Sequence, residues 1–224
     1  MRPRKVSDQE ILSIAKACFL KQGPSVSTQS IAKQVGVSQA TLFKRFGSKE
    51  LLMRAALMLP VHKHHILDVL TEKPDLDAPK AQFRRIAKQM IDFFNDMIPC
   101  FSMMHSAGIV PFERTELSAD ERLPIIGRKA LQSWLEQLKQ AGVIRSDLDC
   151  EIASIALLGS FTSLAFRRHV LQDTGLNCSD GDFVQGLVEI LWQGLMCKST
   201  VENNGRSKPS GEDPIEIKKQ ESSQ

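Results

Sequence analysis

Residues 27–52 read STQSIAKQVGVSQATLFKRFGSKELL, a pattern typical of two short helices joined by a tight turn, with a third helix following. Ser27 can cap a short helix, and Gly36 can end it because a residue without a Cβ adopts the left-handed turn conformation at little cost. Ser38 can cap a second helix over residues 39–45, whose outer side is polar and basic. A short helix, a glycine turn and a basic-polar helix predict a helix-turn-helix, whose second helix enters the major groove of DNA.

The same stretch resembles the TetR family of bacterial transcriptional regulators. The matching residues are Ser27, Ile31, Ala32, Val35, Gly36, Val37, Ser38, Thr41, Leu42, Phe43, Phe46, Ser48, Lys49, Glu50 and Leu52. The resemblance covers roughly residues 7–55, and beyond them only length and helical character agree. The chain departs from the family at Phe43 and Arg45, where tyrosines are usual. Because the chain contains no Tyr, no phenol can bind a phosphate at residue 43.

The candidate DNA contacts lie on and beside the second helix. Gln39 can pair with the edge of an adenine, and the methyl groups of Ala40 and Thr41 suit thymine methyls. By the family resemblance, Lys49 and the free backbone N–H groups at the start of the next helix hold a phosphate. The predicted contacts are Ser27, Thr28, Ser38, Gln39, Ala40, Thr41, Phe43, Lys44, Arg45 and Lys49. The alternative is a solvated helix in an unrelated bundle, which leaves the length of the motif unexplained.

Charge is unevenly spread along the chain. Residues 1–65 hold 11 Lys and Arg against 3 Asp and Glu, whereas residues 66–224 hold 18 against 23. The two parts therefore carry net charges of +8 and −5, which together make the +3 of the whole chain. A basic module on an acidic remainder is typical of a DNA-binding head on a body that does not bind DNA, although ordinary charge scatter is the alternative.

We expect an all-α protein with an N-terminal three-helix domain over residues 1–50. Its first helix should begin after Ser7 and end before Gly23. A fourth helix should start at Lys49 and run to about residue 70, linking the head to the body. Pro60 lies within it and should kink or break it, because proline removes a helix hydrogen bond.

Residues 51–198 should form a helical ligand-binding and dimerisation domain. Helical periodicity covers residues 80–98, 101–109, 124–141, 149–171 and 180–197, and the 101–109 segment is irregular. Pro99 is expected to stop the first of these helices, and Gly142 to stop the third. Residues 199–224 are polar and predict a disordered tail.

The last two helices are apolar around more of their circumference than one core needs, which indicates a second buried face. We expect this face to form a homodimer interface. Its predicted residues are Leu157, Leu158, Phe161, Leu164, Leu187, Leu191, Trp192 and Leu195.

Helix 80–98 and its neighbours are rich in Met and Phe, which suit an adaptable apolar ligand pocket. The predicted lining is Phe83, Met90, Phe94, Met97, Phe101, Met104, Trp134 and Phe161. Arg84, Arg85 or a nearby His could supply one polar anchor. The alternative is that these side chains form only an ordinary core.

We expect neither an enzyme nor a metalloprotein. His62, His64 and His65 cluster, but two ligands on one helical face without a fixed third make solvated or core histidines the better interpretation, so no metal or other cofactor is expected. Glycine-rich phosphate loops, H-E-x-x-H and G-x-S-x-G are all absent from the sequence.

The sequence is also typical of a cytoplasmic protein. We find no signal peptide and no apolar run of the ~18 residues that a membrane span needs, so no membrane association is expected. The five Cys are scattered and form no C-x-x-C pair, which suits a reducing compartment.

Together these patterns predict a homodimeric, ligand-responsive repressor that binds a palindromic double-stranded DNA operator and is released by a small apolar or amphipathic inducer. The alternative is a helical ligand-binding or adaptor protein that keeps a vestigial DNA-binding head.

Overall fold

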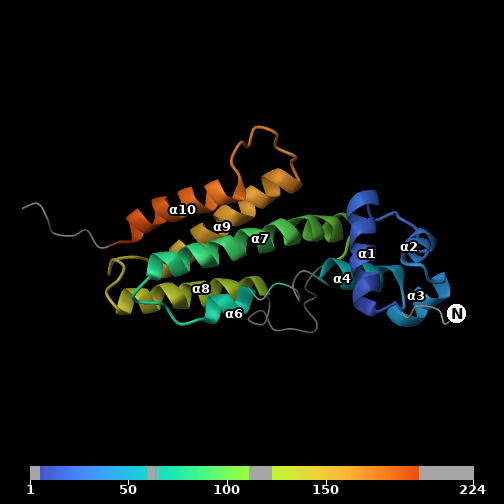
Figure 1. Cartoon of the computed structure of the whole chain (residues 1–224), viewed down its shortest axis with the longest axis horizontal. Coiled ribbons are helices and arrows are strands. Elements are labelled where there is room, and N and C mark those ends of the chain that lie inside the picture. The colour runs from blue at the N-terminus through green and yellow to red at the C-terminus, as the bar shows by residue number, and fades with distance from the viewer. Residues whose placement is uncertain (1–5, 60–63, 65, 111–122, 197–224) are drawn as a thin grey trace, which may run out of the picture.

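A computed structural model describes residues 6–59, 64, 66–110 and 123–196 of the chain. Within these residues the secondary structure is helical, and the one β-bridge pairs Ile144 with Met196. The helices are α1 (Asp8–Gln22), α2 (Thr28–Val35), α3 (Gln39–Phe46), α4 (Lys49–Leu57), α6 (Ile66–Thr71), α7 (Pro79–Ser106), α8 (Leu123–Gln140), α9 (Cys150–His169) and α10 (Asp180–Leu195). Helices α1 to α4 form a head at one end of an elongated molecule, and α6 to α10 form the body (Figure 1).

Serine side chains begin all four helices of the head. The hydroxyl oxygens of Ser7, Ser27, Ser38 and Ser48 each accept a hydrogen bond from the backbone N–H three residues further on, at 3.1–3.2 Å. Each such cap contributes about 1 kcal/mol to helix stability. Gly36 follows α2 with φ 81° and ψ 29°, the left-handed conformation that turns the chain toward α3. The local sequence therefore sets where the helices of the head begin and how α2 turns into α3.

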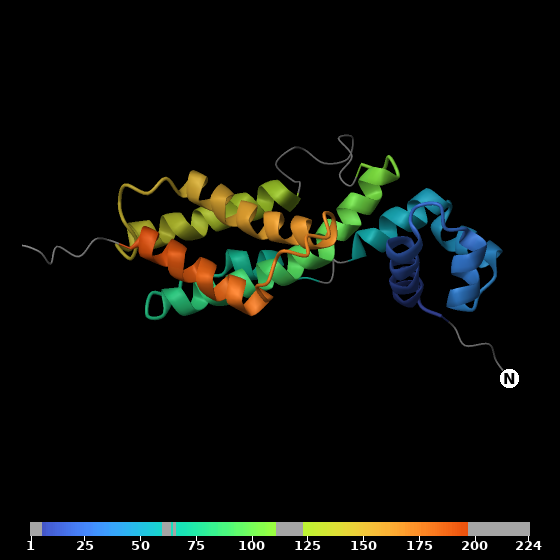
Figure 2. The same ribbon diagram turned by 90° about the horizontal axis from the view of Figure 1, so that it is seen from above.

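Two hydrophobic cores occupy the two ends of the molecule. The head core contains Phe19, Ile31 and Leu42, which are at most 1 % exposed, and it also contains Cys100 and Met104 from α7. The body core is built from α6 to α10. Helix α7 therefore runs through the body and ends inside the head core, and both views show it reaching the head (Figures 1 and 2).

Pro99 does not stop a helix, so that prediction was wrong. Helix α7 continues through Pro99 to Ser106 and includes most of the separate helix expected over 101–109. A proline inside a helix costs about 3 kcal/mol. The side chains of Met97, Cys100 and Met104 are fully buried around it, and burying a large apolar side chain contributes about 1.5–3 kcal/mol. Burial on both sides offsets the cost, and Figure 2 shows that α7 bends along its length.

The single helix expected over residues 49–70 is divided. Helix α4 ends at Leu57, His64 lies outside the helices, and α6 begins at Ile66. Pro60, where the break was expected, lies outside the described residues, as does the predicted tail over 199–224. The predicted helices over 124–141, 149–171 and 180–197 are confirmed as α8, α9 and α10, each within two residues of the expected bounds.

Candidate DNA interface and ligand cavity

The two helices of the helix-turn-helix are joined by a side-chain hydrogen bond. The amide of Gln39, at the start of α3, donates to the hydroxyl oxygen of Thr28, at the start of α2, at 2.6 Å. Thr28 is buried at 8 % exposure, so its place is between the helices and it does not lie on the outer surface where a DNA contact was expected. Leu42 is buried beneath α3. These contacts hold α3 in a defined position on α2.

The outer side of α3 is open to solvent. Gln39, Ala40, Phe43 and Lys44 are exposed, and Figure 1 places α3 at the end of the head away from the body. Thr41 is half-buried, with its hydroxyl 2.8 Å from that of the capping residue Ser38. Ser27 and Ser38 are exposed caps. Most of the predicted DNA contacts are therefore accessible to solvent.

Arg45 has a different environment from the one predicted. Its Nη1 donates to the carbonyl oxygen of Val6 at 2.7 Å and to Oδ1 of Asp8 at 3.1 Å. The side chain thus fixes the beginning of α1 against the end of α3. A phosphate contact by Arg45 would have to compete with both bonds. The two partners lie 37 and 39 residues away in sequence, so no local pattern indicated them.

Lys49 occupies the first position of α4, directly after the capping residue Ser48. It is half-exposed, at a surface hollow that Gly108 and Ile109, just after the end of α7, also line. Backbone N–H groups at a helix start carry partial positive charge and suit an anion. The position of Lys49 therefore allows the predicted phosphate contact, and it lies close to the helix that connects head and body.

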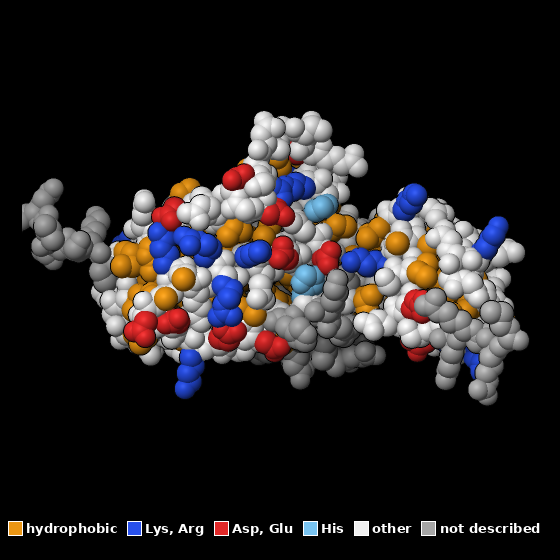
Figure 3. Space-filling model, viewed as in Figure 1, with side chains coloured by type: hydrophobic (Ala, Val, Ile, Leu, Met, Phe, Trp, Pro, Cys, Tyr) orange, Lys and Arg blue, Asp and Glu red, His pale blue; other side chains and the backbone are white. Residues whose placement is uncertain are grey.

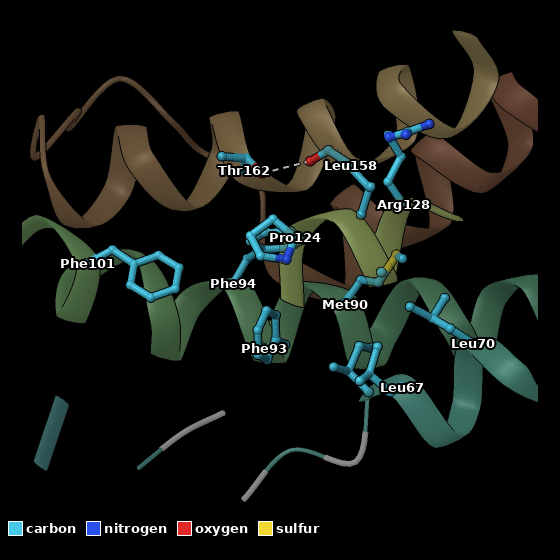
Figure 4. Close-up of a pocket in the computed structure, with 12 residues that line it drawn as sticks. Leu67, Leu70, Met90, Phe93, Phe94, Phe101, Pro124, Arg128, Leu158 and Thr162 are labelled. Atoms are coloured by element: carbon cyan, nitrogen blue, oxygen red, sulfur yellow. Dashed lines mark hydrogen bonds between the residues drawn. The ribbon is translucent and has the colours of Figure 1, made fainter. Parts of the chain in front are cut away.

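The body contains a cavity of about 180 Å³ between α6, α7, α8 and α9 (Figure 4). Its lining comprises Ile66, Leu67, Leu70, Met90, Phe93, Phe94, Phe101, Pro124, Gly127, Arg128, Leu158 and Thr162. Nearly all of these side chains are apolar. An engineered apolar cavity of about 150 Å³ already binds benzene. The space is therefore large enough for a small apolar group.

Three predicted lining residues, Met90, Phe94 and Phe101, do line this cavity. The others belong to the packed cores. Phe83 stacks on Trp134 with ring centroids 5.8 Å apart, and Phe161 packs edge-on against Phe183 at 6.0 Å. Met97 is fully buried in the body core, and Met104 is fully buried in the head core. The sequence could not separate these roles, because Met and Phe fill cores and line cavities equally well.

The remaining lining residues were not among the predicted ones, although those on α7, α8 and α9 lie on helices that each supplied a predicted lining residue. Helix α6 was expected to be the end of a longer helix beside the pocket, but Ile66, Leu67 and Leu70 were not predicted to line it. Arg128 supplies the one cationic side chain among the described lining residues. Its Nη1 donates to Glu151 at 2.9 Å and to Gln132 at 3.2 Å, and Figure 4 shows its aliphatic part beside the cavity with the guanidinium directed toward α9.

Arg84 and Arg85 do not face the cavity, which corrects the expectation that one of them supplies a polar anchor. Both are exposed on α7 at a separate surface hollow beside the start of α10. Arg84 lies 3.7 Å from Glu189, and Arg85 forms an ion pair with Glu72 that lowers the pKa of this carboxyl group by hydrogen bonding. Both guanidinium groups therefore form ion pairs with carboxylates on the surface.

Five of the predicted interface residues are buried inside one subunit. These are Leu157, Phe161, Leu164, Trp192 and Leu195, all at most 8 % exposed. Leu158 lines the cavity, and Leu187 and Leu191 are half-buried against the body core. The prediction was wrong for these five residues, because helices that are apolar on two sides do not reveal which side meets the core of their own chain.

The exposed apolar side chains of α9 and α10 are different ones. Ile152 is 65 % exposed, Ile155 53 %, Phe166 43 % and Ile190 70 %. Gly159 also lies on the exposed side of α9, with open space around it. These residues of α9 recur at helical spacing, so they share one face.

Helix α9 is also long and apolar enough to cross a membrane by length and composition alone, with 33 % of the relevant window buried. The core helix of a globular protein meets the same criterion, and α9 packs against α7 and α8.

His64 is the one described member of the predicted histidine cluster, since His62 and His65 lie outside the described residues. Its Nε2 lies 2.9 Å from Oδ2 of Asp96. Among the described residues, no three His, Cys, Asp or Glu side chains are placed to hold a metal ion.

Comparison with known proteins agrees with this geometry. Residues 11–56 match the family described as bacterial regulatory proteins, tetR family. No curated protein matches the chain. The TetR-family regulator PfmR of Thermus thermophilus is similar in structure, with a TM-score of 0.63, 24 % identity and coverage of 84 % of this chain and 99 % of that one.

Two further solved structures are similar along most of the chain. A TetR-like regulator from Rhodococcus sp. RHA1 has a TM-score of 0.58 at 22 % identity, covering 87 % of this chain and 98 % of that one. A putative TetR-family regulator from Mesorhizobium loti MAFF303099 has a TM-score of 0.57 at 16 % identity, covering 85 % and 96 %. The chain therefore carries a tetR-family helix-turn-helix domain on a helical body, with the fold of TetR-family transcriptional regulators.

Proposed function

We propose that this protein is a cytoplasmic, homodimeric transcriptional repressor whose DNA binding is relieved by a small apolar or amphipathic molecule. The observation that carries the proposal is the arrangement of α7. One helix lines an apolar cavity in the body and also ends inside the core of a helix-turn-helix head. A change at the cavity can therefore reach the DNA-binding surface through one continuous element.

The head supplies the DNA-binding surface. Gln39 and Ala40 are exposed at the start of α3, the end that meets base edges in a helix-turn-helix. Lys44 is exposed and Lys49 is half-exposed, so both side chains can contact phosphates. A dimer must hold two such helices roughly 34–36 Å apart to reach successive major grooves on one side of the duplex. We therefore expect a palindromic operator.

The exposed face of α9 and α10 supports dimerisation. Ile152, Ile155, Phe166 and Ile190 would be unfavourably hydrated in a monomer, and Gly159 would let a second helix approach closely. A two-fold contact through these side chains would join the same surface patch of both subunits and impose two-fold symmetry on the pair of heads. This face replaces the one predicted from the sequence.

The cavity indicates the chemistry of the ligand. Its lining is apolar apart from Arg128 and Thr162, and the Thr162 hydroxyl already donates to the carbonyl oxygen of Leu158 at 2.8 Å. A ligand should therefore bind mainly by buried area and shape. To change the population ratio of two head orientations from 1:99 to 99:1, the ligand must bind one orientation more favourably by ~5.5 kcal/mol.

The test is DNA binding by the full-length protein. We would select preferred duplexes from a random pool and measure affinity by fluorescence anisotropy between 50 and 200 mM salt, a range over which several phosphate contacts change affinity by orders of magnitude. The proposal requires enrichment of a palindrome and affinity that falls steeply with salt.

The same measurement separates the alternative function. Gln39 and Arg45 both donate hydrogen bonds to other residues of the head, so these donors are not free to contact DNA. This observation favours a ligand-binding or adaptor protein with a vestigial head. That protein would bind ligand but would show no salt-sensitive binding to any selected duplex.

A further inference from the structure

The carboxylate of Asp96 joins three segments at the junction of head and body. Its Oδ2 lies 2.9 Å from Nε2 of His64, which is between α4 and α6, and its Oδ1 lies 3.9 Å from Nζ of Lys16 on α1. The side chains of Lys16 and His64 are about four-fifths buried, at 20 % and 22 % exposure. Figure 3 shows acidic, basic and histidine side chains gathered where the head meets the body.

His64 also contacts the wall of the cavity. Its ring lies edge-on to the ring of Phe93, with centroids 5.7 Å apart and an interplanar angle of 86°. Phe93 lines the cavity and contacts the neighbouring lining residue Phe94 at 5.5 Å. Successive contacts therefore lead from the cavity wall to His64, from His64 to Asp96, and from Asp96 to Lys16 in the head.

The part of α7 that follows Asp96 is inserted into the head. Cys100 and Met104 are fully buried in the head core, and the Cys100 thiol donates to the Asp96 carbonyl oxygen at 3.2 Å. Pro99 lies between Asp96 and Cys100 in the chain. It has no N–H to bond the preceding turn, which weakens α7 at this point. Phe101 lines the cavity and packs against both cores.

We propose that Asp96 is the positioning residue of the ligand response: it shares its carboxylate between His64, beside the cavity, and Lys16, on the head. This inference rests on the proposed function. A molecule that displaces Phe93 also displaces the His64 ring. The contact between His64 and the Asp96 carboxylate then weakens relative to the contact between Lys16 and the same carboxylate. The end of α7 beyond Pro99 tilts, and the head, which encloses Cys100 and Met104, moves with it.

The exposure of Asp96 agrees with a positioning role. Its side chain is 41 % exposed, and ion pairs at such sites shift an equilibrium by no more than about fivefold. The contact therefore contributes little to the stability of the fold. An ion pair strengthens as its atoms approach, however, so this contact can favour one of two orientations of the head that are similar in packing energy.

A double-mutant cycle between the cavity wall and the head tests the proposal without a ligand. We would compare Phe93→Leu and Lys16→Met, singly and together, in the full-length protein. The measurement is the rate at which iodoacetamide alkylates Cys100, followed by mass spectrometry, because this thiol becomes accessible only when α7 and the head separate. Lys16 also acts directly on the thiol by charge, but this effect is equal in both halves of the cycle and cancels.

Three further backgrounds serve as controls. Lys16→Arg keeps the charge that pairs with Asp96, Asp96→Asn removes the carboxylate, and Asp92→Asn removes an exposed carboxylate one turn earlier on α7. We expect Phe93→Leu to accelerate Cys100 alkylation in the wild type, in Lys16→Arg and in Asp92→Asn. In Lys16→Met and Asp96→Asn the acceleration should be smaller by about two- to fivefold.

Additive effects of Phe93→Leu and Lys16→Met overturn the proposal, because two residues that share no partner act independently. The absence of any acceleration by Phe93→Leu in the wild type overturns it as well. Binding of 1-anilinonaphthalene-8-sulfonate, and its loss in Phe94→Trp, reports on the cavity separately. If the probe binds and the cycle is additive, the cavity stands and the role of Asp96 fails. If the probe does not bind and the cycle is non-additive, the coupling stands and the ligand cavity fails.

Discussion

Gln39 on α3 donates a 2.6 Å hydrogen bond to Thr28 on α2, so the residue best placed to read a base also fixes the recognition helix on its neighbour. The two roles can be separated. Thr28→Val keeps the shape of Thr28 but removes the acceptor, and it should lower the free energy of unfolding by about 1 kcal/mol while leaving sequence preference unchanged.

Gln39→Ala should instead weaken binding to the selected operator by ~1–3 kcal/mol and leave binding to unrelated duplexes nearly unchanged. Urea unfolding and anisotropy on both duplexes would distinguish the two variants. Loss of specificity in Thr28→Val equal to that in Gln39→Ala would mean that Gln39 only positions α3.

Lys49→Ala should weaken binding about equally on all duplexes. One phosphate contact fewer should reduce the slope of log affinity against log salt by about 0.9. Lys88→Ala is the matched control, because Lys88 is an exposed lysine on α7 in the body. A salt slope that stays the same in Lys49→Ala would exclude Lys49 as a phosphate contact.

Ile190→Glu should yield monomers and abolish tight operator binding. Ile190 is 70 % exposed on α10, so a charge there is tolerated in the isolated subunit but not within a buried interface. Leu76→Glu is the control, since Leu76 is 56 % exposed in the loop before α7. Sedimentation velocity at micromolar concentration should show monomers for Ile190→Glu alone, and a dimeric Ile190→Glu would place the interface elsewhere.

Phe94→Trp should fill the cavity and prevent the response to ligand while DNA binding persists. The larger ring enters a space of about 180 Å³, where it replaces the volume that a ligand would occupy. Leu171→Trp adds a ring at a site that is 59 % exposed, and it should respond like the wild type. Ligand response retained in Phe94→Trp would argue against this cavity as the ligand site.

Burial raises the pKa of the Cys100 thiol from 9.0 to about 11. The neutral thiol is therefore favoured in the folded state, and its contribution is complete below pH 9. As the pH rises from 9 to 11, the unfolded chain ionises first, so folding should weaken by up to about 3 kcal/mol.

Cys100→Ala should lack this part of the pH dependence, whereas Cys178→Ala, at a half-buried position, should retain it. Urea unfolding at pH 8 and pH 10.5 gives the comparison. The chain has no Tyr, so phenol ionisation does not contribute to the difference. Equal pH dependence in the wild type and Cys100→Ala would contradict the assigned burial effect.

The helices that were predicted well are set by residues only a few positions apart in the chain. The capping serines and Gly36 act within one helical turn, and they define α1 to α4 without reference to the body. Pro99 shows the limit of such rules. Its local preference is to end a helix, but the burial of Met97 and Met104 on either side outweighs that preference.

The sites were less predictable than the helices. Arg45 is a basic residue on the recognition helix, as a DNA contact would be. However, its guanidinium donates hydrogen bonds to Val6 and Asp8, which are distant in sequence. Phe83 and Phe94 both lie on α7, yet one packs on Trp134 and the other lines the cavity. Such differences depend on which helices pack around each side chain.

The all-α class, the helix-turn-helix and the division into a basic head and an acidic body could all be predicted without a structure, because caps, turns, periodicity and charge are properties of short segments. Three features required the folded arrangement: which apolar face of α9 is buried, where the cavity lies, and the entry of α7 into the head core beyond Asp96. These features arise from contacts between segments far apart in the chain, and a periodic apolar pattern carries no information about which partner will cover it.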